Sequence, residues 1–151
     1  TWFMQNFMDD PHLGSIREEG RIYSATGAGR VAFIDVEDIA CVAVEALTGA
    51  ALKNRDVMLT GPEALDYRDV AQLIAAARVR PVVFHDLTVE ALAARFEAAG
   101  MSAEYAHALA AVDDEIARGS EQQVTGEVAM LTGRPARTFA AFAAENCAFW
   151  A

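Results

Sequence analysis

RVAFIDVEDIACVAVEAL, residues 30–47, joins an apolar run directly to an acidic helix start, and this pattern favours an α/β fold over an all-helical one. The residues RVAFI at 30–34 are typical of a buried strand. Asp35 and Asp38 follow, and carboxylates at these positions accept hydrogen bonds from the free N–H groups of a first helical turn and face its positive end. Apolar residues then recur at helical spacing as far as Leu47. We therefore expect a strand followed at once by a helix.

The same alternation continues along the chain. Besides 30–34, strands are predicted for DVMLT at 56–60 and PVVFHDL at 81–87, with a short one near Ile22–Ser24 inside an otherwise loop-rich stretch, 14–30. Helices are predicted after the capping residues Asp35, Asp66, Thr88, Ser102 and Thr138, with a short one after Thr125. About three good strands and six helices, alternating at first, indicate an α/β fold with a parallel sheet. The helices offer more cover than so small a sheet requires.

The composition describes a single acidic domain spanning residues 1–151. The net charge of −10 argues against binding to nucleic acid or to an anionic membrane surface. No apolar run approaches the ~20 residues that cross a bilayer. Cys41 and Cys147 have neither metal nor redox spacing, which favours free thiols in a reducing cytoplasm.

No motif in the sequence defines a catalytic centre. Gly27-Ala28-Gly29 has spacing that could cradle a phosphate, but a strand follows where a cradle needs a helix, so a tight turn is favoured. No histidine has a second ligand at metal-site spacing, and we expect no metal. No tyrosine is followed four residues later by the lysine that would lower its pKa for hydride-transfer chemistry. The acidic run Asp113-Asp114-Glu115 is most simply a solvated helix face, although acid–base work by paired carboxylates stays open.

Five stretches, taken together and in order, resemble the C-terminal half of NmrA-like proteins, which are atypical short-chain dehydrogenase/reductases. The resemblance is strongest to the ergot alkaloid biosynthesis reductase-like branch and covers nearly the whole chain. TGPEAL before an aromatic residue and a capped helix, and TGRPxRTF near the end, are specific in combination. The five stretches are TWFMQNF (1–7), IYSATGAGRVAFIDVEDIACVAVEAL (22–47), VMLTGPEALDYRDVAQLI (57–74), HDLTVEALAARFEAAGMSAEYAHAL (85–109) and VTGEVAMLTGRPARTFAAFAAE (124–145).

The resemblance implies an incomplete Rossmann-like fold. In the family an N-terminal half precedes this region and carries the glycine-rich turn that holds the pyrophosphate of NAD(P) at a helix N-terminus. NAD(P) is therefore the cofactor implied, but we expect this chain alone to bind it weakly or not at all and to be inactive. The activity implied is that of the substrate-side portion of an NAD(P)-dependent oxidoreductase. Two alternatives stay open: a dinucleotide-binding sensor or regulator without catalysis, and a stand-alone interaction or oligomerisation module.

Carried over by position, Phe3, Gln5, Asn6, Phe33 and Asp35 would line the cleft between cofactor and substrate. Packing in a core explains Phe3 and Phe33 as well, because aromatic side chains bury readily, and helix capping explains Asp35. Asn6 is the residue that packing explains least, so it is the strongest of the five candidates for a role in the cleft.

The opening TWFMQNFMDD is unusually apolar for a chain end, which is normally polar and frayed. In the family this segment and the strand at 56–60 belong to a larger fold, so here an apolar face and a strand edge would be bare. Such edges recruit another chain. We predict a homo-oligomer that buries residues 1–8 and the strand 56–60.

Overall fold

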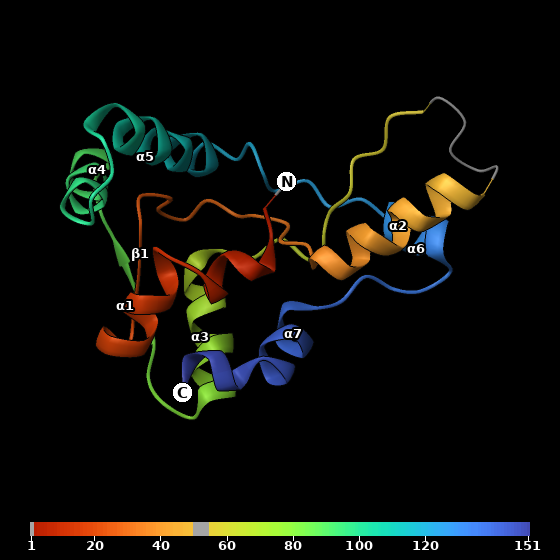
Figure 1. Cartoon of the computed structure of the whole chain (residues 1–151), viewed down its shortest axis with the longest axis horizontal. Coiled ribbons are helices and arrows are strands. Elements are labelled where there is room, and N and C mark those ends of the chain that lie inside the picture. The colour runs from red at the N-terminus through yellow and green to blue at the C-terminus, as the bar shows by residue number, and fades with distance from the viewer. Residues whose placement is uncertain (1, 50–54) are drawn as a thin grey trace.

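The computed structural model describes residues 2–49 and 55–151, and within these the chain has the predicted α/β architecture (Figure 1). This part of the chain forms seven α-helices, two short 3₁₀ helices and one parallel pair of strands. The elements are η1 (Met4–Met8), α1 (His12–Glu19), β1 (Arg21–Ser24), α2 (Val36–Thr48), α3 (Tyr67–Arg78), β2 (Val83–Asp86), α4 (Val89–Ala98), α5 (Ala103–Ala117), α6 (Glu127–Thr132), α7 (Phe139–Glu145) and η2 (Cys147–Trp150).

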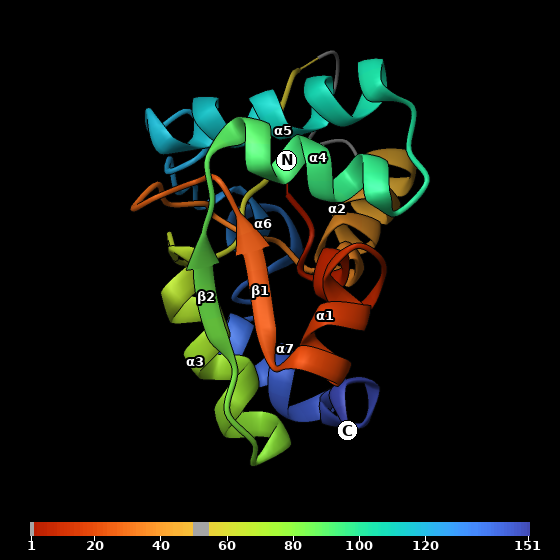
Figure 2. The ribbon, with the colours of Figure 1, turned by 90° about the vertical axis from the view of Figure 1, so that its left-hand side faces the viewer.

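The sheet consists of β1 and β2, which run parallel from Arg21 opposite Val83 to Ser24 opposite Asp86. Both strands confirm sequence predictions, the first near Ile22–Ser24 and the second within 81–87. Helix α1 lies beside β1 and helix α3 beside β2, as Figure 2 shows. The sheet is therefore narrow, and helices pack beside both of its strands.

The structure contradicts the predicted strand at 30–34, although residues 31–35 are all buried. These residues pair one at a time with three separate segments: Val31 with Leu65, Ala32 with Glu121 and Ile34 with Phe3. A strand needs a continuous ladder with one neighbour, and changing partners at nearly every residue prevents it. The apolar pattern correctly predicted burial and wrongly predicted a ladder.

The predicted strand at 56–60 is also wrong. No backbone–backbone hydrogen bond joins these five residues to the rest of 2–49 and 55–151. The carbonyl oxygen of Met58 accepts a 2.7 Å hydrogen bond from the Thr125 hydroxyl instead. A strand cannot form without a neighbour that supplies a ladder, and the described chain supplies none here.

Helix α1 forms where the sequence predicts loop. Gly14 and Ser15 lower the helix propensity of this segment, which is why its pattern favours a loop. Burial decides otherwise, because Ile16 is fully enclosed in the main core. Gly20 then closes the helix in the left-handed conformation at φ 64°, which glycine adopts without strain.

The predicted helix starts are confirmed by their hydrogen bonds. In each of five helices the side chain before the first turn accepts from a backbone N–H of that turn, which satisfies a group that the helix itself leaves free. The five residues are Asp35, Asp66, Thr88, Ser102 and Thr138.

The main core is built around Phe7, which explains the apolar opening of the chain. The centroid of its ring lies 5.3 Å from that of Phe33, 5.7 Å from Tyr67 and 5.5 Å from Phe139. Met4, one turn earlier, is fully buried in the same cluster. Thr1, the first residue of the predicted oligomer contact 1–8, lies outside the described residues.

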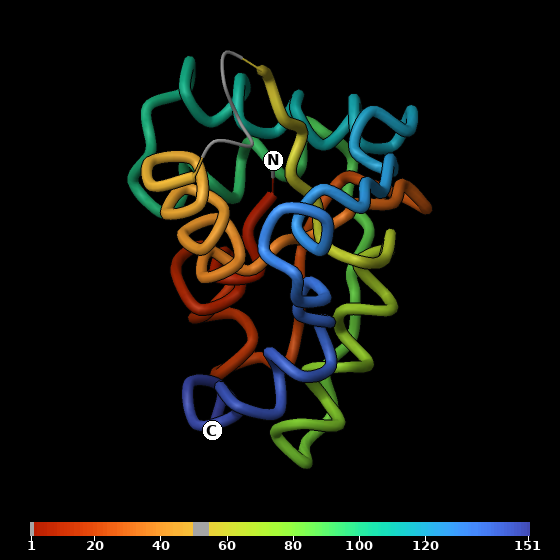
Figure 3. Tube along the Cα trace, turned by 90° about the vertical axis from the view of Figure 1, so that its right-hand side faces the viewer, coloured from red at the N-terminus to blue at the C-terminus, as the bar shows by residue number. Residues whose placement is uncertain are grey.

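Helices α4 and α5 form a hairpin with a core of its own, made by Leu92, Ala93, Phe96, Ala106 and Ala110. This hairpin lies across the carboxyl ends of β1 and β2 (Figure 2). At the other end of the molecule the C-terminal segment η2 contacts α1 and α3 (Figure 3). None of the helices among the described residues is long and apolar enough to cross a membrane.

Candidate functional site

A cleft of about 340 Å³ lies where the carboxyl end of the sheet meets the α4–α5 hairpin. Its lining residues come from the N-terminal segment, α1, β1, α3, α4 and α5. Parallel α/β folds place ligands at this end of the strands, because loops there can converge on one point. The lining residues are Trp2, Gln5, Asn6, Asp9, Asp10, Pro11, His12, Tyr23, Tyr67, Phe96, Leu109 and Asp113.

His12 opens α1 and stacks on Phe7, with the two ring centroids 5.0 Å apart and the planes 22° from parallel. Burial lowers the pKa of its imidazole from 6.5 to about 4. The ring is therefore neutral at neutral pH, and a neutral imidazole can both donate and accept a hydrogen bond.

Tyr67 is 2% exposed, yet no hydrogen bond joins its hydroxyl to another residue of 2–49 and 55–151. Burial raises the pKa of this phenol, and the nearby Asp113 carboxylate raises it further. The side-chain amide of Asn6 likewise makes no hydrogen bond within the described chain. Both groups line one cleft and have no hydrogen-bond partner among the described residues, so they are free to bind a ligand.

Asp113 reaches the cleft from α5 and is 8% exposed. Its Oδ2 accepts two hydrogen bonds, one from the Ser24 hydroxyl at 2.7 Å and one from the Ala25 amide at 2.8 Å. Burial raises the pKa of this carboxyl, and the two hydrogen bonds act in the opposite direction. The carboxylate thereby joins the hairpin to the end of β1 and also presents an acceptor to the cleft.

Among the described residues, no lysine or arginine lines the cleft. A guanidinium lies over the ring of Tyr23, where Arg95 Cζ is 3.7 Å from the ring centroid. This cation is already paired, since Arg95 Nη2 lies 2.7 Å from Glu19 Oε1. The described lining of the cleft therefore combines aromatic surfaces with carboxylates and one neutral imidazole, that of His12.

Two of the five predicted site residues, Gln5 and Asn6, line this cleft. Gln5 is committed to helix α2, because its Nε2 donates to Asp35 Oδ1 at 2.8 Å and its Oε1 accepts from the Val36 amide at 3.2 Å. Only Asn6 keeps a free polar edge there.

The other three predicted residues lie outside the cleft. Phe33 is a core residue, and Phe3 borders a separate hollow of about 310 Å³ with Ile39 and residues 57–59. Asp35 caps α2 and lies 3.0 Å from Arg137 Nη1, which matches the capping alternative.

Sequence reasoning missed His12, Tyr23, Tyr67 and Asp113. A signal existed for Asp113 alone: it falls four residues after Leu109 and three before Ile116, on the apolar stripe of α5. A carboxylate on a buried face needs partners, so it should not have been assigned to solvent. The three aromatic residues come from separate elements that only the fold brings together.

The cleft fits one end of a nicotinamide cofactor. The carboxamide of Asn6 has a donor and an acceptor that complement those of a nicotinamide carboxamide. Nothing described here fits the pyrophosphate: the turn at Gly27 and Gly29 precedes no helix, and a Cβ on Gly29 would lie 2.3 Å from the carbonyl oxygen of Ile116. That glycine serves close packing against α5, which matches the predicted tight turn.

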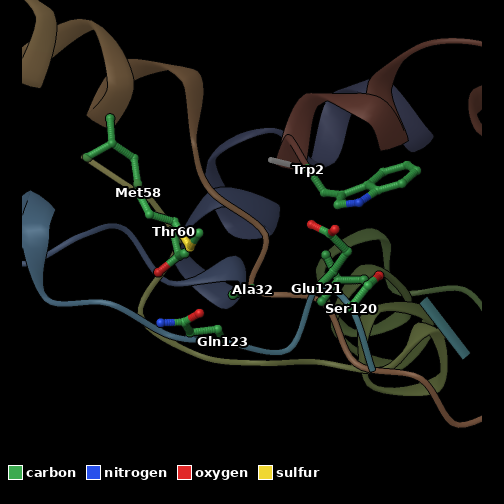
Figure 4. Close-up of a pocket in the computed structure, with 9 residues that line it drawn as sticks. Trp2, Ala32, Met58, Thr60, Ser120, Glu121 and Gln123 are labelled. Carbon is green, nitrogen blue, oxygen red and sulfur yellow. The ribbon is translucent and has the colours of Figure 1, made fainter. Parts of the chain in front are cut away.

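A second hollow, of about 200 Å³, lies on the other side of Trp2 (Figure 4). Trp2 and Glu121 border one side of it, and Met58 and Thr60 border the other. The Thr60 hydroxyl accepts from the Thr125 amide at 2.8 Å, so this hydroxyl is already in use. Within the described chain, no three potential metal ligands gather here or elsewhere.

The fold defines the class of protein. An NADPH-dependent quinone oxidoreductase from Escherichia coli, solved with NADPH, matches this structure with a TM-score of 0.85 at 22% identity. The match covers 95% of this chain and 50% of that one. The architecture is therefore that of about half of a Rossmann-like fold.

The sequence comparisons agree at higher identity. YesF, an uncharacterized oxidoreductase of Bacillus subtilis, is 42% identical over 150 residues, which cover 99% of this chain and 52% of YesF. Agroclavine dehydrogenase of Claviceps fusiformis is 41% identical over 152 residues, which cover 99% of this chain and 53% of that enzyme. No protein-family model matches.

The chain thus spans about half the length of the curated relatives it matches. The resemblance is confirmed: over nearly its whole length this chain is similar to the C-terminal half of NmrA-like, NAD(P)-dependent oxidoreductases.

Proposed function

We propose that this chain is the substrate-side part of an NAD(P)-dependent oxidoreductase and that its cleft holds the molecule to be reduced. The observation that carries the proposal is the cleft itself, where the carboxyl end of the sheet presents unpaired polar groups on Asn6 and Tyr67 among aromatic rings. The relatives are named as an oxidoreductase and a dehydrogenase, and the matched structure is an NADPH-dependent enzyme.

The residues of the cleft have distinct roles in this proposal. A reduced nicotinamide, when bound, supplies a hydride. The Asn6 carboxamide would hold the nicotinamide carboxamide. The ring of Phe96 stacks against a planar acceptor such as a quinone or an iminium compound. The Tyr67 hydroxyl donates a hydrogen bond to the atom on which negative charge develops.

The isolated chain is inactive in this proposal. Dinucleotide affinity depends largely on the pyrophosphate, which binds at a helix N-terminus behind a glycine-rich turn. The described residues contain no strand–turn–helix of that kind. Hydride transfer therefore needs the half of the fold that the relatives carry in addition.

A chimera tests this function. The N-terminal half of YesF is joined to this chain at Trp2, and consumption of NADPH is measured with a quinone and with an iminium acceptor. We expect turnover by the chimera, none by the isolated chain, and a fall of at least tenfold on Asn6→Ala. Gln123→Ala, in the second hollow, is the matched control and should leave turnover unchanged. A chimera that binds NADPH and reduces neither acceptor contradicts the proposal and indicates a dinucleotide sensor instead.

We also propose that the chain self-associates, as the sequence predicts, through residues 1–8 and 56–60, and that it acts in the cytoplasm. Phe3 is 38% and Met58 59% exposed, and the backbone of 56–60 has no ladder partner in the described chain. Met4 and Phe7 already pack inside one chain, so the contact must rest on the exposed neighbours. Cys41 and Cys147 are free thiols, which supports a reducing compartment.

A further inference from the structure

The segment η1 is too short to fix its own side chains. It is a 3₁₀ helix of five residues, Met4–Met8, and Phe3 before it supplies no side-chain cap. Hydrogen bonds in such helices have poor geometry, so a short run depends on contacts with the rest of the fold. Asn6, which lines the cleft, lies in the middle of this segment. The contacts that fix η1 therefore also decide where Asn6 points.

Gln5 joins η1 to the first turn of α2. Its Nε2 donates to Asp35 Oδ1 at 2.8 Å, and its Oε1 accepts from the Val36 amide at 3.2 Å. A carboxylate can only accept and a backbone N–H can only donate, so one orientation of the Gln5 amide satisfies both partners. The side chain is therefore fixed at its far end by two hydrogen bonds.

Asp35 is a rigid anchor for this contact. Its side chain is 1% exposed, and its Oδ1 also accepts from the Glu37 amide at 3.0 Å. Its Oδ2 lies 3.0 Å from Arg137 Nη1. These contacts hold Asp35 without Gln5, so Gln5 is the group that attaches η1 to a position already set.

Asn6 has no comparable anchor of its own. Its side-chain amide makes no hydrogen bond within the described chain, and its backbone N–H donates to the Phe3 carbonyl oxygen at 3.2 Å. On one side of it Gln5 is bonded to α2, and on the other the Phe7 carbonyl accepts from the indole of Trp150. The direction of the Asn6 side chain is thus set by its two neighbours.

We propose that Gln5 is a positioning residue of the cleft, whose two hydrogen bonds to the start of α2 hold η1 so that the Asn6 carboxamide points into the cleft. The inference rests on the proposed function, because Asn6 is the group that would hold the nicotinamide carboxamide. Without Gln5, a ligand would have to order the Asn6 side chain on binding, at a cost in affinity. Gln5 acts through Asn6, since both polar atoms of its own amide are taken by α2.

The conformation of Asn6 can be measured on the chain without any ligand. Three-bond NMR couplings from Asn6 Cγ to its backbone nitrogen and carbonyl carbon report the χ1 rotamer. We expect one rotamer in the unmodified chain and averaged couplings in Gln5→Met, which keeps the side-chain length and removes both hydrogen bonds. Thr132→Val is the matched control: it removes a hydroxyl of α6 that donates to Val128 and accepts from Arg134, and it should leave the Asn6 couplings unchanged.

A binding cycle shows whether Gln5 acts through Asn6. The probe is nicotinamide, titrated at millimolar concentration against the backbone amides around the cleft. We expect Gln5→Met to weaken binding about two- to tenfold, as the ordering of one side chain would give. In a chain that already carries Asn6→Ala, adding Gln5→Met should have no further effect, because the group that it positions is gone.

Four results would decide the matter. Averaged Asn6 couplings in the unmodified chain, or a single rotamer that persists in Gln5→Met, overturn the inference. An equal loss of affinity from Gln5→Met with and without Asn6 also overturns it, because Gln5 would then act independently. If nicotinamide does not bind the unmodified chain at all, the proposed function loses support, and the couplings alone decide the role of Gln5. Far-UV circular dichroism checks that each variant is folded, and the measurement on the unmodified chain requires no variant.

Discussion

The indole Nε1 of Trp150 donates a 2.7 Å hydrogen bond to the carbonyl oxygen of Phe7, 143 residues earlier in the chain. Both side chains are fully buried, so the bond ties the C-terminal segment η2 to the centre of the main core. It also satisfies a carbonyl that would otherwise be buried without a partner. The two ends of the chain therefore stabilise each other.

Trp150→Phe should lower the free energy of unfolding by about 1–3 kcal/mol, because the Phe7 carbonyl loses its donor and the smaller ring leaves a gap. The measurement is the urea midpoint followed by circular dichroism. Trp2→Phe is the control, since Trp2 is only partly buried and its indole makes no hydrogen bond within the described chain. Equal effects of the two substitutions would contradict the prediction.

Arg137→Met should cost about 3 kcal/mol of stability. Arg137 joins α2 to α7 through Asp35, Glu37 and Glu145, and removing it leaves the buried Asp35 carboxylate without its cation. Asp35→Asn added to Arg137→Met should recover part of the loss, because the amide carries no charge.

Arg118→Met is the control for Arg137→Met. Arg118 contacts Asp114 and Glu115 on the exposed side of α5, where ion pairs contribute less than about 1 kcal/mol. Thermal unfolding of the three variants gives the ranking. A loss at Arg118 as large as that at Arg137 would show that burial of Asp35 is not the cause.

The stability of the fold should depend on His12 between pH 6.5 and about 4. The folded pKa lies below the unfolded value, so the unfolded state binds more protons in this window and stability falls as pH falls. The contribution of His12 is complete above pH 6.5, and its loss approaches about 3 kcal/mol near pH 4.

His12→Phe removes this contribution and keeps the stack on Phe7. The raised pKa of Asp113 has the opposite effect on stability, because the folded state takes up this proton at a higher pH than the unfolded state does. The quantity to measure is therefore the unfolding free energy of the unmodified chain minus that of the variant. This value should fall as the pH is lowered from 6.5 to 4. A difference that stays constant from pH 6.5 to 4 would refute the prediction.

Gly61→Ala should destabilise the chain by about 3 kcal/mol or more, since overpacking a rigid contact forces the backbone to move. A Cβ at this position would lie 1.8 Å from the carbonyl oxygen of Phe33. Gly126→Ala is the matched control, because a Cβ there meets nothing within 4 Å. Expression yield and melting temperature separate the two variants, and a stable Gly61→Ala protein would exclude this close contact.

Light scattering tests self-association of the 16.2 kDa chain. We expect a mass of two chains or more, and Met58→Asp should reduce it to one, because a charge would enter the proposed contact. Met130→Asp changes an equally exposed methionine on α6 and should leave the mass unchanged. A single-chain mass for the unmodified protein at high concentration would rule out the proposed contact.

Local chemistry made much of this fold predictable. The helix starts at Asp35, Asp66 and Thr88 follow from capping, which involves only residues within one turn. The alternation of strands and helices indicated the α/β class, and the five matching stretches indicated the family. The resemblance predicts that Asn6 lines a cleft between cofactor and substrate; in the structure Asn6 lines a cleft, and its role there stays a prediction.

The sequence alone did not determine which segments of the chain pair or pack with one another, and only the tertiary structure assigned these contacts. Residues 30–34 and 56–60 have strand patterns, but a ladder depends on what lies alongside, and that is fixed by distant parts of the chain. Asp113 belongs to an acidic run that suggests solvent, yet packing of α5 against the end of β1 buries it beside Ser24. Capping and periodicity act over a few residues and can be recognised in the sequence, whereas the cleft joins residues from His12 to Asp113 and exists only once the chain has folded.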